Sequence, residues 1–200
     1  MSEQDNKRVG SGTQFGYDAD TAGLAIGVDG LLDNGSVLGL SLSMSNTNVD
    51  GKGTGSARND IDSYTASLYM DKATAAGYVE GSLTYGINQN NSSRIINTDG
   101  TNATYSADYD SDQISLKIGG GIPNDVGNKT FITPFASLTA TRISTDAYTE
   151  KSTTANDALR LRVAQADVDS YVGTIGIKAH KVTANGTPMI SLAINNEFGD

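Results

Sequence analysis

The fold is decided by the stretch LGLSLSM, residues 38–44, in which large apolar side chains alternate with glycine and serine. Successive side chains of an extended strand point to opposite faces, so this spacing gives one apolar face and one small, polar face. The same alternation recurs in seven other stretches between residues 24 and 194. We therefore predict an all-β chain with about eight strands and no amphipathic helix.

The composition agrees with strands that lack a conventional core. Of the 200 residues, 37% are hydrophobic, 23 are glycine and none is tryptophan. The net charge of -9 argues against a nucleic-acid partner, because affinity for the phosphate backbone depends on lysine and arginine. The absence of cysteine excludes a disulfide framework and a thiolate metal site. No run of about 18 apolar residues is present that would form a membrane helix.

Alternation alone does not separate a soluble β-sandwich from a membrane barrel. Residues 104–122, 130–150 and 163–182 are extended stretches of about twenty residues, longer than the roughly 9–11 that a tilted strand needs to cross a bilayer. The connections between the alternating stretches are short and long in turn: 33–35, 49–59, 71–76, 91–103, 123–129, 151–162 and 183–186. Because outer-membrane barrels alternate tight turns with long polar loops, we predict an antiparallel transmembrane β-barrel. The alternative is a soluble β-sandwich or adhesin-type binding domain.

The two faces of each strand then have different surroundings, since a membrane barrel is apolar outside and polar inside. The residues predicted to face lipid are Leu24, Ile26, Val28, Leu38, Leu40, Leu42, Leu68, Leu83, Ile114, Leu116, Ile118, Leu138, Ile175, Ile177 and Leu192. Those predicted to face the lumen are Asp29, Ser41, Ser43, Thr65, Ser67, Glu80, Ser82, Thr84, Lys117 and Lys178. Small lining residues would leave an eight-stranded barrel partly empty, which favours a wider barrel that encloses something. A small self-contained outer-membrane barrel is the second alternative.

Four further side chains fall on the predicted lipid face. Tyr64, Tyr85 and Tyr171 lie toward the loop ends of their strands, where an aromatic girdle would sit. Arg142 falls on this face by strict alternation. Either it lies at the membrane edge or a bulge shifts the phase of its strand.

No catalytic constellation is evident. His180 is the only histidine, and we expect it inside the barrel near a tight turn, far from the external loops. Asp108, Asp110 and Asp112 imitate half of a calcium loop, but Gln113 and Gly119 stand where such a loop needs glycine and glutamate. We interpret the three aspartates as a solvated acidic stretch, with binding of lipopolysaccharide-bridging divalent ions as the alternative. We predict no catalytic residue, no metal ligand and no cofactor.

Seven stretches, in order along the chain, resemble the β-domain (translocator) of autotransporters, the type V secretion proteins of Gram-negative bacteria. They are GYDADTAGLAIGVD (16–29), LGLSLSMSNTNVDGKG (38–53), DIDSYTASLYMD (60–71), YVEGSLTYGIN (78–88), DYDSDQISLKIGGG (108–121), TPFASLTATR (133–142) and NNEFGD (195–200). Together they cover nearly the whole chain.

The resemblance implies a twelve-stranded barrel threaded by an α-helix that links to a secreted passenger. By that comparison residues 1–20 are a polar loop after the first strand, and residues 21–200 are strands two to nine of a partial barrel. The resemblance implies a pore for secretion and surface display of the passenger, in the outer membrane of a Gram-negative bacterium. The expected partners are outer-membrane lipid and lipopolysaccharide, the protein's own passenger and linker helix, and the barrel-assembly machinery.

Overall fold

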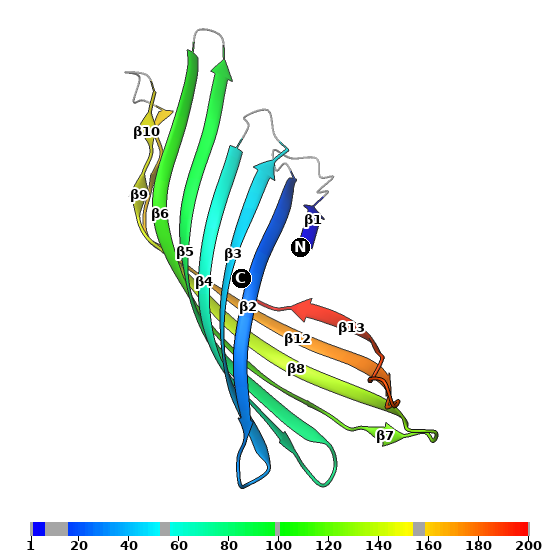
Figure 1. The fold of residues 1–200 in the computed structure, drawn as a ribbon. Coiled ribbons are helices and arrows are strands. Elements are labelled where there is room, and N and C mark those ends of the chain that lie inside the picture. The colour runs from blue at the N-terminus through cyan, green and yellow to red at the C-terminus, as the bar shows by residue number, and fades with distance from the viewer. Residues whose placement is uncertain (1, 7–15, 53–56, 99–100, 154–158, 200) are drawn as a thin grey trace.

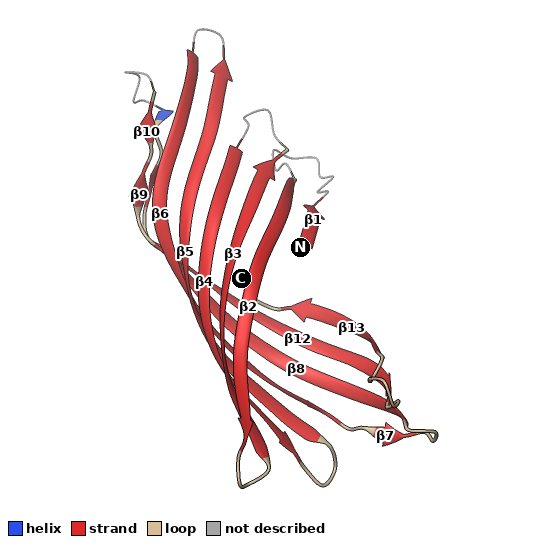
Figure 2. Ribbon diagram, viewed as in Figure 1, coloured by secondary structure: helices blue, strands red, loops and turns tan. Residues whose placement is uncertain are grey.

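The computed structural model describes residues 2–6, 16–52, 57–98, 101–153 and 159–199. Its long elements are all strands, as Figure 2 shows. They are β2 (Tyr17–Leu31), β3 (Ser36–Gly51), β4 (Ala57–Ala73), β5 (Tyr78–Thr98), β6 (Thr101–Gly121), β8 (Thr130–Thr145), β12 (Ala166–Lys181) and β13 (Met189–Glu197). The short strands are β1 (Ser2–Asn6), β7 (Asn124–Asp125), β9 (Tyr148–Thr149), β10 (Lys151–Ser152) and β11 (Arg162–Val163). The prediction of about eight long strands is confirmed. Within the described ranges, no helix has the length and hydropathy needed to cross a bilayer.

The main sheet is antiparallel, and its order in space follows the chain: β1-β2-β3-β4-β5-β6-β8-β12-β13. It is strongly curved, with β2 to β4 on one limb and β8, β12 and β13 on the other (Figure 1). The sheet is a half-barrel, and its edge strands β1 and β13 do not pair with each other in the described part of the chain. Because the long strands form one sheet, the structure excludes the two-layer sandwich. We call the end of the sheet that holds the connections 32–35, 74–77, 122–129 and 182–188 the turn end, and the opposite end the far end.

The short connection predicted at residues 33–35 is present as a tight hairpin at Asn34-Gly35 between β2 and β3. Gly35 has a φ of 76°, and its amide donates to the Leu32 carbonyl at 2.9 Å. Asn34 is not among the residues with positive φ, so the turn is not the type I′ turn that the dipeptide favours. The Asn34 side chain instead accepts a hydrogen bond from the Ser36 amide at 3.0 Å. The local sequence thus predicted the hairpin but not its turn geometry.

The pairing of β8 with its neighbours is continuous. Residues 166–181 of β12 pair one for one with residues 145–130 of β8. Residues 111–121 of β6 pair in the same way with residues 145–135. No bulge therefore shifts β8, and Arg142 lies on the same face as Leu138.

Two connections that were expected to be long loops are largely strand. β5 and β6 contain 21 residues each and pair from Tyr78↔Gly121 to Thr98↔Thr101, which spans the predicted loop at 91–103. β3 extends to Gly51, inside the predicted loop at 49–59. These segments lack apolar alternation, but a continuing sheet satisfies backbone hydrogen bonds whatever the side chains are. Polar composition was therefore a poor guide to where the strands end.

The N-terminal segment also differs from its prediction as a loop. β1 pairs with β2 from Ser2↔Thr21 to Asn6↔Tyr17, and β2 begins at Tyr17 rather than near residue 21. The composition of residues 2–6 disfavours strand in isolation, but the open edge of β2 supplies the backbone partners. The rest of the predicted loop, residues 7–15, lies outside the described residues.

The connection from β8 to β12 folds back onto β6 at the far end. The Asp146 amide donates to the Asp110 carbonyl at 3.0 Å, and Lys151 and Ser152 of β10 pair with Ser106 and Tyr105. Under this segment lie the apolar residues that the structure buries within its described ranges, namely Ala103, Tyr105 and Ala107. The packed core is thus small and lies at the far end of the sheet.

Candidate pore lining and outer surface

One face of the sheet is lined by small hydroxyl side chains that bond across the strands. Ser43 contacts Thr65, Ser67 lies 2.7 Å from Thr84, and Ser115 lies 2.9 Å from Thr141. These pairs connect β3 with β4, β4 with β5, and β6 with β8. Each of these hydroxyls thus obtains a partner without a large side chain, so this part of the face is polar.

All ten residues predicted to face the lumen lie on this hydroxyl-lined face. The register sets Ser41 opposite Ser67, Ser67 opposite Thr84, and Ser82 opposite Lys117. Because alternate residues of a strand share a face, the register places the rest of the set there as well. Two of its members, Glu80 and Lys117, form an ion pair of 2.8 Å.

The hydroxyl-lined face is the concave one. The Lys178 ammonium of β12 lies 5.8 Å from the centre of the Tyr78 ring of β5, although β6 and β8 stand between these two strands. On the opposite limb, the Tyr69 hydroxyl of β4 crosses β3 and donates to the Asp29 carboxylate of β2 at 2.9 Å. Side chains converge in this way only on the inside of a curved sheet. The half-barrel therefore encloses the polar face.

Glycines make room for the large rings on the concave face. A Cβ atom on Gly39 would stand 2.2 Å from Cζ of Tyr69, and one on Gly176 would stand 2.5 Å from Cζ of Phe135. Each ring lies over a glycine of the neighbouring strand, at a place that a Cβ atom would otherwise occupy.

All fifteen residues predicted to face lipid lie on the convex face, and all are exposed. Their exposed fractions run from 39% at Leu38 to 71% at Val28 and Leu192. They form rows across the sheet, such as Val28, Leu40, Leu68, Leu83 and Leu116, each paired with the next. A continuous apolar surface of this kind requires an apolar partner.

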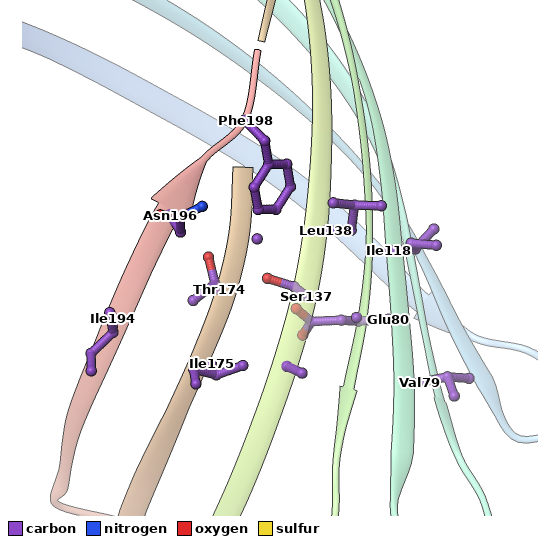
Figure 3. A pocket seen from close by; sticks show the side chains of 13 residues that line it. Val79, Glu80, Ile118, Ser137, Leu138, Thr174, Ile175, Ile194, Asn196 and Phe198 are labelled. Atoms are coloured by element: carbon purple, nitrogen blue, oxygen red, sulfur yellow. The ribbon is translucent and has the colours of Figure 1, made fainter. Parts of the chain in front are cut away.

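A groove of about 840 Å³ lies on this convex surface, and Figure 3 shows the side chains that line it. Its walls are two rows of convex-face residues, including Val79, Ile118, Leu138, Ile175, Ile194 and Phe198. Gly173 widens it, since a Cβ there would lie 2.9 Å from Cζ of Phe198. Glu80 and Ser137, which alternation places on the concave face, also border the groove. The groove is apolar and holds no set of polar groups that would bind a polar ligand.

The convex apolar rows end, toward the far end, in polar and aromatic side chains. Arg142 donates two hydrogen bonds to Asp169 of β12, at 2.7 and 2.8 Å. The Tyr85 hydroxyl donates to Asp112 at 2.8 Å. The sequence left two interpretations of Arg142 open. The register supports the interpretation without a bulge, in which Arg142 lies on the convex face where the apolar rows end toward the far end.

The far end of the concave face carries a cluster that the sequence did not predict. Arg94 of β5 binds Glu150 through two hydrogen bonds of 2.7 Å, stacks over the Tyr105 ring at 4.7 Å, and donates to the Leu159 carbonyl. The hydrogen bonds from Arg94, and a further one from the Leu161 amide, hold the pKa of Glu150 below its ordinary value although burial opposes this shift. No sequence signal joined Arg94 to Glu150, because the fold of the β8–β12 connection brings them together.

The remaining candidate residues form no reactive centre in the described ranges. His180 lies on the concave face near the turn end, stacked on Phe131 with 5.0 Å between ring centres. Asp108, Asp110 and Asp112 lie exposed on the convex side of β6. Among the described residues, no three histidine, aspartate or glutamate side chains are grouped so that they could hold a metal ion.

A curved antiparallel sheet, polar inside and apolar outside, defines the class of outer-membrane β-barrels. Comparison with known proteins gives the family: residues 2–200 match the model of the autotransporter β-domain, and the chain belongs to this family. Autotransporter β-domains reside in the outer membrane of Gram-negative bacteria.

Relatives and solved structures agree with this assignment. The chain is 26% identical over 192 residues to an extracellular serine protease of Serratia marcescens, covering 95% of this chain but 17% of that protein. The β-domain of the Bordetella autotransporter BrkA superposes with a TM-score of 0.71 at 23% identity, covering 93% of this chain and 74% of that one. The translocator domain of NalP from Neisseria meningitidis gives a TM-score of 0.80 at 17% identity, covering 98% and 66%. The chain therefore spans a small part of its protease relative and about two thirds of the NalP domain.

Proposed function

We propose that this domain forms the wall of an outer-membrane pore through which a linked passenger is secreted, and that it then anchors the passenger at the cell surface. The observation that carries the proposal is the division of one curved sheet into a concave hydroxyl face and a convex apolar face. In lipid, the neighbouring strands of such a sheet satisfy one another's backbone groups, and its convex rows present apolar side chains. Its concave side leaves a polar path for a polypeptide.

The remaining roles follow from this arrangement. The convex rows would contact lipid, and the exposed aspartates beyond them would face the lipopolysaccharide region. The passenger and its linker would occupy the concave side, and the barrel-assembly machinery would insert the sheet. We infer that the domain acts without catalysis of its own, because the residues that the structure describes bring no nucleophile and base together.

Cysteine accessibility tests the assignment of the two faces. Ser82 and Leu83 are adjacent in β5 but point to opposite sides of the sheet. In the full protein in its membrane, we expect Ser82→Cys to react with a water-soluble maleimide and Leu83→Cys to resist it. A lipid-soluble reagent should label Leu83→Cys.

Heat-modifiable migration in gels is the folding control for both variants. Equal labelling of the two cysteines by the water-soluble reagent in a folded barrel would contradict the proposed facing. A detergent-free, monodisperse protein would contradict the membrane pore itself.

A further inference from the structure

The concave face carries opposite charges on its two limbs near the turn end. Asp29 of β2 and Asp71 of β4 lie close to the tight connections 32–35 and 74–77. Lys178 of β12 lies close to the connection 182–188, on the other limb of the curved sheet (Figure 1). Alternation in the paired strands places all three on the concave face, with Asp29 in the register row of Tyr69 and Lys117.

These charges are not neutralised by ion pairs within the described part of the chain. The ion pairs there join other residues, and Glu80 and Lys117 between the two limbs compensate each other. Asp29 accepts a hydrogen bond from the neutral Tyr69 hydroxyl, which fixes its position without removing its charge. An uncompensated charge on a narrow, low-dielectric wall is costly, and its field extends into the enclosed space.

Lys178 is held in place by aromatic rings. Its ammonium lies 5.8 Å from the ring centres of both Tyr78 and Phe135, which come from β5 and β8. Cation–π contacts of this kind hold an ammonium group in position and leave its charge available to another partner. The two rings thus hold the Lys178 ammonium group in a fixed position, and its positive charge acts on the space that the sheet encloses.

We propose that the lumen near the turn end has an electric field directed across it, from Lys178 toward Asp29 and Asp71, which seats a polypeptide segment of matching polarity. The segment presents basic side chains to the β2–β4 limb and acidic side chains to β12. This inference rests on the proposed function, in which the concave face encloses a secreted or retained polypeptide. It adds the chemistry of that polypeptide and the residues that orient it.

Charge reversal in the full-length protein, reconstituted in planar lipid bilayers, tests the proposal. Because a seated segment blocks the pore, we expect Lys178→Glu, and separately Asp29→Lys with Asp71→Lys, to raise the open-channel probability about tenfold, as an attraction becomes a repulsion. Lys178→Met, which keeps the aliphatic packing between the rings, should give a smaller increase in the same direction.

Matched variants carry the same charge changes on the convex face. Lys181→Glu alters the neighbouring face of β12, and Asp20→Lys with Asp62→Lys alters the convex side of β2 and β4. These should leave channel opening at the wild-type level. Heat-modifiable migration and cell-surface display of the passenger show that each barrel is folded.

The outcomes separate the two proposals. If the wild-type protein forms pores and displays its passenger, but concave and convex variants open equally, the polarity inference is overturned and the pore proposal stands. If neither the wild-type protein nor any variant conducts, and no passenger is displayed, both are overturned. An increase confined to the concave variants supports the inference.

Discussion

At the residue scale, the fold depends on where a side chain is absent as much as on where one is present. Tyr69 reaches Asp29 only because Gly39 leaves the intervening strand bare. Gly39 is buried, whereas Gly30, on the neighbouring strand, has open space around the position of a Cβ. The two glycines therefore differ in what a methyl group would meet.

We predict that Gly39→Ala destabilises the folded domain by about 1–3 kcal/mol, since the new methyl group overlaps the Tyr69 ring and must displace it. Gly30→Ala is the matched control and should change stability by less than about 1 kcal/mol. The measurement is the midpoint of urea unfolding in detergent, followed by heat-modifiable migration. Equal midpoints for the two variants would show that the ring moves away freely.

The ion pair between Arg94 and Glu150 makes the stability of the β8–β12 connection depend on pH. This cluster lies beyond the apolar rows, outside the membrane-spanning part of the strands. Since the folded structure lowers the pKa of Glu150, the stabilisation is present above the ordinary pKa of a glutamate. It is lost as the pH falls through the lowered value.

We predict that hydrogen exchange at the Leu161 amide, which donates to Glu150, accelerates as the pH is lowered through that range, after correction for intrinsic exchange. Glu150→Gln should expose this amide at neutral pH, at a local cost of roughly 1.5–3 kcal/mol. Asp146→Asn, in the same connection, is the control. Exchange that follows the same pH profile in wild type and Glu150→Gln would refute this role.

At the scale of elements, β5 and β6 extend far past the membrane. A strand of 21 residues is about 70 Å long at roughly 3.3 Å per residue, whereas about 9–11 residues cross the bilayer. The outer halves are held by their own ladder and by the connection that folds onto β6. Tyr105, which is 0% exposed, is the largest fully buried side chain at that contact.

We predict that Tyr105→Ala loosens the β8–β12 connection by about 3 kcal/mol, because it leaves a cavity below Arg94. Protection of residues 146–153 in hydrogen exchange should fall, while heat-modifiable migration of the membrane part stays unchanged. Tyr64→Ala, on the convex face, is the control and should leave that protection intact. Loss of the whole barrel in Tyr105→Ala would show instead that the far end and the membrane part fold as one unit.

At the scale of the whole molecule, the protein has an inside without having a conventional core. Its rows of large aliphatic residues lie on the convex face, and the apolar residues that are buried in the described part of the chain lie at the far end. The enclosed space is lined by hydroxyls and by charges on opposite limbs. This inversion of the usual distribution explains why only 37% of the residues are hydrophobic although the chain has the length of a domain.

Much of this was predictable from the sequence. Alternation divided the 25 assigned residues into two sets, and the register places each set on one face of the sheet, because the described strand pairs contain no bulge. That the convex set meets lipid and the concave set lines a lumen stays a prediction. The ends of the strands could not be predicted. Residues 91–103 are polar in composition, yet most of them are held in strand by the β5–β6 hairpin, whose ladder runs from Asn91↔Asp108 to Thr98↔Thr101.

The sequence by itself determined the all-β class, the approximate number of long strands and the side of each strand on which a residue lies. These properties follow from the alternation of apolar and polar residues within each strand, so the local sequence specifies them. Only the tertiary structure decided that Lys178 approaches Tyr78, that Arg94 binds Glu150, and which face is concave. Those contacts join segments separated by tens of residues, and they depend on the curvature of the sheet, which no local pattern encodes.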